Sequence, residues 1–273
     1  MPCSVDFAFL DSGTGGIPYM LDLKEKCPKA RCVYLGDAAN FPYGEKTADE
    51  ICSCATSAVQ TIINLWQPKT VVIACNTISV TALKQLREHF PFLPIVGTVP
   101  AIRLAARTTK NKRIGLLATN ATVKHPYNAK LISDFAYDCK VFSRGDPDLV
   151  SFIEHDLFTA TKEERIRAVE PAVSYFKDCG CDTIILGCTH FTHIANDISY
   201  VAGKDISIVD SRNGVALQAL RVESSFAGEN QNSSNILPPD ESFFVTGYVS
   251  QKDEAEYKAL CNRFNIPWGG VVK

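Results

Sequence analysis

The sequence predicts an α/β fold of two doubly wound, parallel-sheet domains. Short apolar runs rich in β-branched residues alternate with longer amphipathic segments, as in parallel strands joined by helices. Two of these runs, 70–75 and 182–187, resemble each other because both lead into a cysteine and small polar side chains, Cys75-Asn76-Thr77 and Cys188-Thr189-His190. With 273 residues, enough for two ordinary domains, the repeat predicts two similar sheets that face each other.

Composition narrows the class of protein. The chain is 46% hydrophobic and 21% charged, as in globular proteins, and its net charge of −2 with no basic block argues against nucleic acid or an anionic membrane as partner. No apolar run reaches the roughly 18 residues of a membrane span, and residues 1–6 do not resemble a signal peptide. Eleven cysteines, an odd number, favour free thiols in a reducing cytoplasm over disulfides.

A glycine-rich turn follows the first predicted strand. The apolar run 5–10 leads into Asp11-Ser12-Gly13-Thr14-Gly15-Gly16, before a helix predicted at 17–27. Such a turn lets backbone N–H groups approach a small carboxylate or phosphate, with a purely structural turn as the alternative. Pro18 occupies the place of the third glycine of Gly-x-Gly-x-x-Gly, so the dinucleotide fingerprint is not met.

The rest of the first half continues the alternation. A strand at 31–35 ends at Gly36-Asp37, and Pro42 and Gly44 predict a shaped turn after it. Thr47 and Glu50 have the spacing of a capping box, which predicts a helix start at Thr47. The remaining expected elements are a helix at 47–66, the first cysteine strand at 70–75, a helix at 79–89, a strand at 94–97 and a helix near 100–108.

The second half repeats the pattern. A buried strand at 113–118 leads into the polar segment 119–122, and Thr161 and Glu164 form a second predicted capping box. The other expected elements are a strand at 139–143, helices at 147–157 and 162–179, the second cysteine strand at 182–187, a strand at 207–209, a helix capped by Asp210-Ser211 that runs to 226, a polar surface loop at 228–241, a strand at 243–246 and a helix at 251–264.

Polar residues follow five of the predicted strands, namely Asp11, Asp37, Cys75, Thr119 and Cys188. In open α/β sheets ligands bind at the carboxyl ends of the strands, and binding clefts are common between domains. We therefore expect these residues to line one shared cleft.

Three interpretations of the two strand-end cysteines compete. Buried cysteines often serve packing alone. A zinc site could use side chains from Cys179, Cys181, Cys188, His190 and His193. The predicted strand between Cys181 and Cys188 spans seven residue steps, about 23 Å, so these two cysteines cannot bind the same ion. Only Cys188, His190 and His193 are left as possible zinc ligands. The third interpretation is a pair of acid–base thiols, one removing a proton from a C–H carbon while the other protonates the opposite face.

Acid–base thiols need neighbours that tune them, because a free thiol has a pKa of about 8.5. Asp11, at a strand end, could orient Cys75. Glu154 or His190 could assist Cys188, although a solvated helix residue and a structural histidine are the respective alternatives. The chemistry requires no cofactor, and no motif indicates one.

At these residues the sequence resembles the glutamate racemase family, whose members make D-glutamate for peptidoglycan without a cofactor. The resemblance covers most of the chain. Its motifs are Asp11-Ser12-Gly13, Gly15-Gly16, Gly36-Asp37, Pro42-Tyr43-Gly44-Glu45-Lys46, Ala74-Cys75-Asn76-Thr77, the 119–122 segment, Glu154, Gly187-Cys188-Thr189-His190, Asp210-Ser211 and Phe244-Val245-Thr246-Gly247.

The resemblance implies two α/β domains related by a pseudo-two-fold axis, with glutamate in the cleft between them. We expect one domain to comprise 1–97 plus 210–273 and the other 98–209. By carry-over, the acid–base residues are Cys75 and Cys188, and the assisting groups are Asp11, Glu154 and His190. The implied substrate contacts are Ser12, Pro42, Tyr43, Gly44, Asn76, Thr77, Thr119, Thr122 and Thr189.

The implied activity is interconversion of L- and D-glutamate in the cytoplasm, for peptidoglycan synthesis, cell-wall biogenesis and cell shape. An aspartate racemase or other acidic amino-acid racemase, and a non-catalytic protein that binds small anions, are the alternatives. Glutamate is the expected partner, with no nucleic acid, membrane, metal or cofactor, and a homodimer is left open. The chain departs from the family at Ala38-Ala39-Asn40, where many members have Thr-Ala-Arg, and at Gly97-Thr98-Val99-Pro100, which lacks the usual acidic residue.

Overall fold

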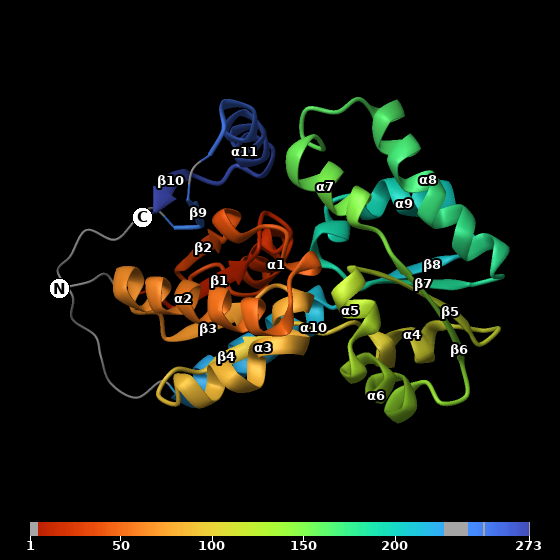
Figure 1. The fold of residues 1–273 in the computed structure, drawn as a ribbon, viewed down its shortest axis with the longest axis horizontal. Coiled ribbons are helices and arrows are strands. Elements are labelled where there is room, and N and C mark those ends of the chain that lie inside the picture. Colours follow the sequence, from red (N-terminus) through yellow and green to blue (C-terminus); the bar gives the residue numbers. More distant parts are fainter. Residues whose placement is uncertain (1–4, 227–239, 248, 273) are drawn as a thin grey trace. The chain divides into compact units, whose positions relative to one another are not determined.

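Every strand pairing in the described part of the chain is parallel, and the strands form two separate sheets. The computed structural model describes residues 5–226, 240–247 and 249–272 (Figure 1). The chain divides into two units, one formed by 1–98 with 212–273 and the other by 99–211. The predicted fold class, α/β with two parallel sheets, is thereby confirmed.

The first unit contains a six-stranded sheet in the order β10-β9-β2-β1-β3-β4. Strands β9 and β10 come from the C-terminal part of the chain and are drawn in blue beside the red β2 in Figure 1. The elements are β1 (Phe7–Asp11), α1 (Ile17–Lys26), β2 (Cys32–Gly36), the 3₁₀ turns η1 (Ala38–Asn40) and η2 (Tyr43–Glu45), α2 (Ala48–Trp66), β3 (Thr70–Ile73), α3 (Asn76–His89), β4 (Ile95–Gly97), α10 (Arg212–Phe226), β9 (Ser242–Thr246), α11 (Gln251–Phe264) and β10 (Trp268–Val272).

Helices α2 and α3 cover one face of this sheet. Alternate strand residues, Ala8 and Leu10 in β1 and Val71 and Ile73 in β3, point to this face and pack with the apolar sides of the two helices. Helices α1 and α10 pack against each other and contact β2, β3 and β4 outside this cluster, which places them on the other face. The central strands are therefore buried on both sides, as their continuous apolar sequences predict.

The second unit contains a four-stranded sheet in the order β6-β5-β7-β8. Its core forms where β5, β7 and α4 meet, around Ile102, Ile114, Leu116 and Ile185. The elements are α4 (Ile102–Thr108), β5 (Arg113–Ala118), α5 (Asn120–Lys124), α6 (Pro126–Phe135), β6 (Lys140–Gly145), α7 (Pro147–His155), α8 (Lys162–Asp178), β7 (Thr183–Leu186), η3 (Thr189–Thr192), α9 (Ala195–Ala202) and β8 (Ser207–Val209).

Both predicted capping boxes are present. The Thr47 N–H donates to Glu50 Oε2 at 2.8 Å, and the Glu50 N–H donates back to Thr47 Oγ1 at 3.4 Å. The same reciprocal pair joins Thr161 and Glu164 at the start of α8. Each pair satisfies N–H groups at a helix start, which explains why these two starts were predictable from sequence.

Other boundaries differ from the prediction. Helix α3 begins at Asn76 rather than Ser79, and β3 ends at Ile73 rather than residue 75, because Cys75 itself occupies the N-cap position. Among the described residues, the helices α5, α6 and α9, the strand β10 and the 3₁₀ turn η3 have no counterpart among the predicted elements. Most of the predicted surface loop at 228–241 lies outside the described residues.

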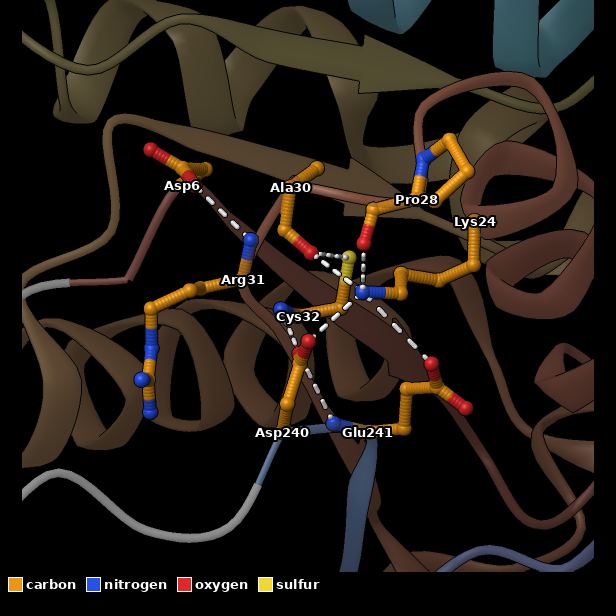
Figure 2. A network of polar contacts seen from close by, with 8 residues as sticks. All are labelled: Asp6, Lys24, Pro28, Ala30, Arg31, Cys32, Asp240 and Glu241. Carbon is orange, nitrogen blue, oxygen red and sulfur yellow. Dashed lines mark hydrogen bonds and ion pairs between the residues drawn. The ribbon is translucent and has the colours of Figure 1, made fainter.

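A buried lysine joins two distant segments at the amino-terminal side of the first sheet (Figure 2). Lys24 Nζ donates to the carbonyls of Pro28 (2.9 Å) and Ala30 (2.7 Å) and to Asp240 Oδ2 (2.6 Å). Asp240 Oδ1 in turn accepts the N–H of Cys32 at 2.7 Å. Burial lowers the pKa of Lys24, but the hydrogen bond and charge of Asp240 outweigh it, so the pKa is raised. The cluster thus holds the start of β9 beside the start of β2.

We expect Lys24→Met to destabilise the protein by about 1–2 kcal/mol, because it removes the hydrogen bonds of the buried amine to the Pro28 and Ala30 carbonyls, while the partly exposed Asp240 carboxylate keeps access to water. Since the pKa of Lys24 is raised, this contribution is fully present below the ordinary value of 10.5 and is lost only as the pH rises through the higher folded-state value. Urea unfolding followed by circular dichroism measures the loss of unfolding free energy, which should be the same at pH 7 and at pH 9 because both lie below 10.5.

Lys26→Met is the matched control on the same helix. Lys26 pairs with Asp22 at 2.8 Å in an i,i+4 arrangement near the surface, so we expect a loss below about 0.5 kcal/mol. Equal losses in the two variants would contradict a special role for the buried amine.

Candidate functional site

In the first unit, the Cys75 thiol lies just beyond the carboxyl end of β3. Cys75 is buried and occupies the N-cap position of α3, and its carbonyl accepts the N–H of Ser79 at 3.0 Å. The first N–H groups of a helix and its dipole favour an anion at this position. The positive end of the α3 dipole therefore lies at Cys75.

Asp11 and Ser12 lie at the neighbouring strand end. Strands β1 and β3 pair in parallel with Leu10 opposite Ile73, and the Ala74 N–H continues this ladder by donating to the Leu10 carbonyl at 2.8 Å. Asp11 is fully buried, and its Oδ1 accepts the N–H of Ser12 at 2.6 Å. The predicted carboxylate and the predicted thiol thus leave adjacent strands at the same edge of one sheet.

The glycine-rich turn is packed directly onto this edge. A Cβ on Gly16 would lie 2.5 Å from the Cβ of Ala74, so no larger residue fits there. The Tyr34 hydroxyl fixes the turn, because it donates to the Gly13 carbonyl at 2.8 Å and accepts the Gly16 N–H at 2.9 Å. Tyr34 is absent from the predicted site, although a tyrosine inside a buried strand signals that its hydroxyl has a partner.

Asn76 and Thr77, both predicted as substrate contacts, form the buried first turn of α3. Within the described residues, neither the Oδ1 nor the Nδ2 atom of Asn76 has a hydrogen-bond partner, although the residue is only 2% exposed. Buried amides without partners are rare in folded proteins and call for an explanation. A bound polar ligand beside Cys75 would satisfy both atoms.

The predicted substrate loop Pro42-Tyr43-Gly44 is held by the buried carboxylate of Asp37. The Tyr43 hydroxyl donates to Asp37 Oδ2 at 2.5 Å. Burial, followed by the charge of Asp37, raises the pKa of Tyr43 far above its ordinary value, so the phenol stays neutral. Because this hydroxyl is committed to Asp37, the backbone of Tyr43 and Gly44 is better suited than the side chain to contact a substrate.

In the second unit, three predicted residues form a connected relay. The Cys188 thiol follows β7, and its Sγ lies 3.7 Å from Nδ1 of His190. The other ring nitrogen, Nε2, lies 3.0 Å from Oε2 of Glu154 in α7. All three side chains are buried, so the interpretation of Glu154 as a solvated helix residue is wrong.

In one tautomer, the histidine is placed to act on the thiol. With Nε2 donating its proton to the Glu154 carboxylate, Nδ1 carries the lone pair that faces the Cys188 thiol. The imidazole can then take the thiol proton, and the carboxylate stabilises the resulting cation. The arrangement is that of a nucleophile or base, an imidazole and an orienting carboxylate.

The predicted threonines of this unit are also buried at strand ends. Thr119 caps α5, where its Oγ1 accepts the Thr122 N–H at 3.2 Å and donates to Thr122 Oγ1 at 3.0 Å. Thr189 follows Cys188 directly, and its carbonyl accepts the Thr192 hydroxyl at 2.8 Å. Asn128, absent from the predicted site, is buried and donates from Nδ2 to the Thr122 carbonyl.

Metal binding and a membrane span are two further possibilities for the described residues. Among them, no group of three or more His, Cys, Asp or Glu side chains is placed to hold a metal ion, so the Cys188–His190–His193 set gains no support. No helix in the described ranges has the length and apolar character needed to cross a membrane.

Comparison with known proteins identifies the relatives of this chain. The family model for Asp/Glu/Hydantoin racemase matches residues 22–218. The glutamate racemase of Treponema pallidum (strain Nichols) is 35% identical over 266 residues, which cover 97% of this chain and 96% of that protein. That of Actinobacillus pleuropneumoniae serotype 3 is 38% identical over 247 residues, 89% of this chain and 92% of the relative.

Solved structures agree with these relatives. The crystal structure of Escherichia coli glutamate racemase, in complex with L-glutamate and the activator UDP-MurNAc-Ala, matches with a TM-score of 0.82 and 28% identity over 98% of this chain and 97% of that one. Isoform RacE1 from Bacillus anthracis matches with a TM-score of 0.77 and 26% identity over the same shares. The resemblance inferred from the motifs is confirmed.

We expect two variants of Glu154 to differ in their free energy of unfolding, because Glu154 is bonded to His190. Glu154→Ala leaves His190 Nε2 buried without its acceptor and should cost about 3 kcal/mol, whereas Glu154→Gln keeps an acceptor oxygen and should cost about 1 kcal/mol. Urea unfolding of the two proteins measures the difference. Glu170→Ala, on the exposed side of α8, controls for the loss of a glutamate, and identical losses in all three would contradict the pairing.

Proposed function

We propose that this chain, which belongs to the glutamate racemases of the Asp/Glu/Hydantoin racemase family, inverts glutamate by two-thiol proton transfer with Cys75 and Cys188 as the acid–base pair. As a member of that family it is an isomerase that interconverts L- and D-glutamate. The residues that carry out the chemistry, and the way they do so, are the substance of the proposal.

One observation carries it: each unit presents a buried thiol just beyond the carboxyl end of a central parallel strand, beside groups that can adjust its proton affinity. Cys75 has the N-terminus of α3, and Cys188 has the His190–Glu154 pair. Packing cysteines need no such neighbours. Matched backbone positions with different tuning groups suit two bases that meet opposite enantiomers of the same substrate.

The proton transfers balance without any other reagent. The Cys188 thiolate takes the Cα proton of L-glutamate, and the electron pair of the broken C–H bond moves toward the α-carboxylate. The Cys75 thiol then protonates Cα on the opposite face, which gives D-glutamate and leaves Cys75 as the thiolate. The reverse reaction uses the same two groups with their roles exchanged, and His190 holds or returns the Cys188 proton.

Neutral groups are proposed to hold the substrate. The unpartnered amide of Asn76, the Thr77, Thr119, Thr122 and Thr189 hydroxyls, and the backbone near Ser12 and Pro42–Gly44 supply donors and acceptors for two carboxylates and an ammonium group. The Asp11 carboxyl group, buried at the same sheet edge as Cys75, is proposed to contact the ammonium group and to orient the thiol.

The proposed setting is the cytoplasm, where D-glutamate would serve peptidoglycan synthesis. Two-thiol chemistry requires reduced cysteines, and the ten cysteines in the described part of the chain are all free. A reducing compartment would keep Cys75 and Cys188 in that state.

Cys75→Ser and Cys188→Ser should each lower the rate of racemisation by at least about a hundredfold, because a serine hydroxyl is a far weaker acid–base group near neutral pH. Incubation of each protein with L-glutamate in D₂O measures this directly. Optical rotation reports inversion, and proton NMR reports deuterium uptake at Cα.

Cys52→Ser and Cys139→Ser, at partly buried positions on α2 and before β6, are the matched controls and should retain activity. Near-normal rates in both strand-end variants would return Cys75 and Cys188 to a packing role. Exchange with L-aspartate but not L-glutamate would assign the chain to another acidic amino-acid substrate.

A further inference from the structure

The Asp37 carboxylate is buried, and the side chains that donate to it within the described residues are all neutral. It accepts the Tyr43 hydroxyl at 2.5 Å, Asn40 Nδ2 at 3.2 and 3.0 Å, and the Thr246 hydroxyl at 2.6 Å. Asp37 is 2% exposed, and none of the ion pairs found among the described residues includes it. A buried carboxylate in this state depends on each of its hydrogen bonds, since no cation compensates for a lost one.

Thr246 contributes to this arrangement from the other end of the sequence. It ends β9, which pairs with β2 through Val245 opposite Gly36, the residue before Asp37. Its Oγ1 donates to Asp37 Oδ1 and also accepts the N–H of Ala39 at 3.2 Å. One hydroxyl therefore fixes both the carboxylate and the first residues of η1.

The next residue closes the contact sterically. Gly247 has φ +77°, and a Cβ built on it would lie 2.6 Å from the Cβ of Ala39 and 3.1 Å from its Cα. Thr246 and Gly247 thus hold the turn after β2 by two hydrogen bonds and one close approach. We call these two residues, with Asp37 and Ala39, the β9 buttress.

The β9 buttress continues directly into the proposed substrate loop. The Tyr43 hydroxyl is bonded to the same carboxylate as the Thr246 hydroxyl, so a displacement of Asp37 moves Tyr43. Tyr43 and Gly44 begin η2, whose backbone is the part of the loop left to contact substrate.

We propose that Thr246 is a positioning residue for glutamate binding, acting through Asp37 and Tyr43 on the 42–44 loop. The proposal rests on the function proposed above. It assigns a role in the site to a residue that does not touch the reacting atoms and lies 203 positions from Tyr43 along the chain, between positions 43 and 246. Its signature is a change in substrate binding with the chemical step preserved.

Thr246→Val tests this with an isosteric side chain that lacks the hydroxyl. We expect KM for L-glutamate to rise about tenfold, the effect of losing one hydrogen bond to a charged group, with kcat changed by less than about twofold. Thr246→Ser restores the hydroxyl and should return KM to within about twofold of the wild type. Racemisation followed by circular dichroism gives both parameters.

Thr70→Val is the matched control. Thr70 is a fully buried threonine in β3 of the same sheet, and within the described residues its Oγ1 has no hydrogen-bond partner. The same chemical change there should leave KM and kcat as in the wild type, which separates loss of the Thr246 hydroxyl from the general effect of a valine.

The outcomes are distinct. An unchanged KM in Thr246→Val, or a raised KM that Thr246→Ser does not restore, overturns the positioning role. Should Thr246→Val not fold, Thr246→Ala decides, because its smaller side chain also lacks the hydroxyl, and an unchanged KM there also overturns the role. If wild-type protein exchanges no Cα proton of glutamate in D₂O, the proposed function fails instead.

Discussion

The parallel, in-register pairing of β1 with β2 and β3 is the constraint on which the first half of the site depends. It brings the carboxyl ends of three buried strands to one edge, so that Asp11, Asp37 and Cys75 leave the sheet as neighbours although 64 positions separate the first from the last, from 11 to 75. The ladder continues past the strands through the Asp37 and Ala74 N–H groups, which donate to the carbonyls of Asp11 and Leu10. Backbone hydrogen bonds, rather than flexible side chains, therefore set the spacing of these residues.

Each of the two cysteines follows a central strand and caps the next helix or 3₁₀ turn, but the groups found beside the two thiols differ. Cys75 lies at the start of a helix of 14 residues, where the positive end of the helix dipole is, and the buried Asp11 leaves the neighbouring strand at the same sheet edge. Cys188 begins a short 3₁₀ turn and instead faces an imidazole that is held by a carboxylate. The groups proposed to act on the two thiols therefore differ in kind, a helix end with Asp11 for Cys75 and an imidazole held by a carboxylate for Cys188.

Most strands and two helix starts were predictable, because the sequence patterns that indicate them lie within a few residues of each element. Continuous β-branched runs gave the buried strands, and the Thr47–Glu50 and Thr161–Glu164 spacings gave two helix starts. Elements without such signals were missed: α5 is a single turn, and β10 contains Gly269 and Gly270, which weaken a strand pattern. The residues that support the site, Tyr34 and Asn128, act through contacts with distant turns, which spacing along the chain does not reveal. That the two thiols meet at one Cα stays a prediction.

The first unit is built from two segments that are far apart in the sequence, so the order of synthesis decides when its sheet can be completed. The second unit is continuous, so all its strands are available once residue 211 has been made. The first unit is interrupted, and its sheet lacks β9 and β10 until residues 242–272 have been made. Pairings between segments so far apart in sequence form late, because closing the intervening loop costs entropy before any contact repays it. Asp37 and its turn therefore have their Thr246 partner only after residue 246 has been made, which ties the arrangement of the 42–44 loop to the presence of strand β9.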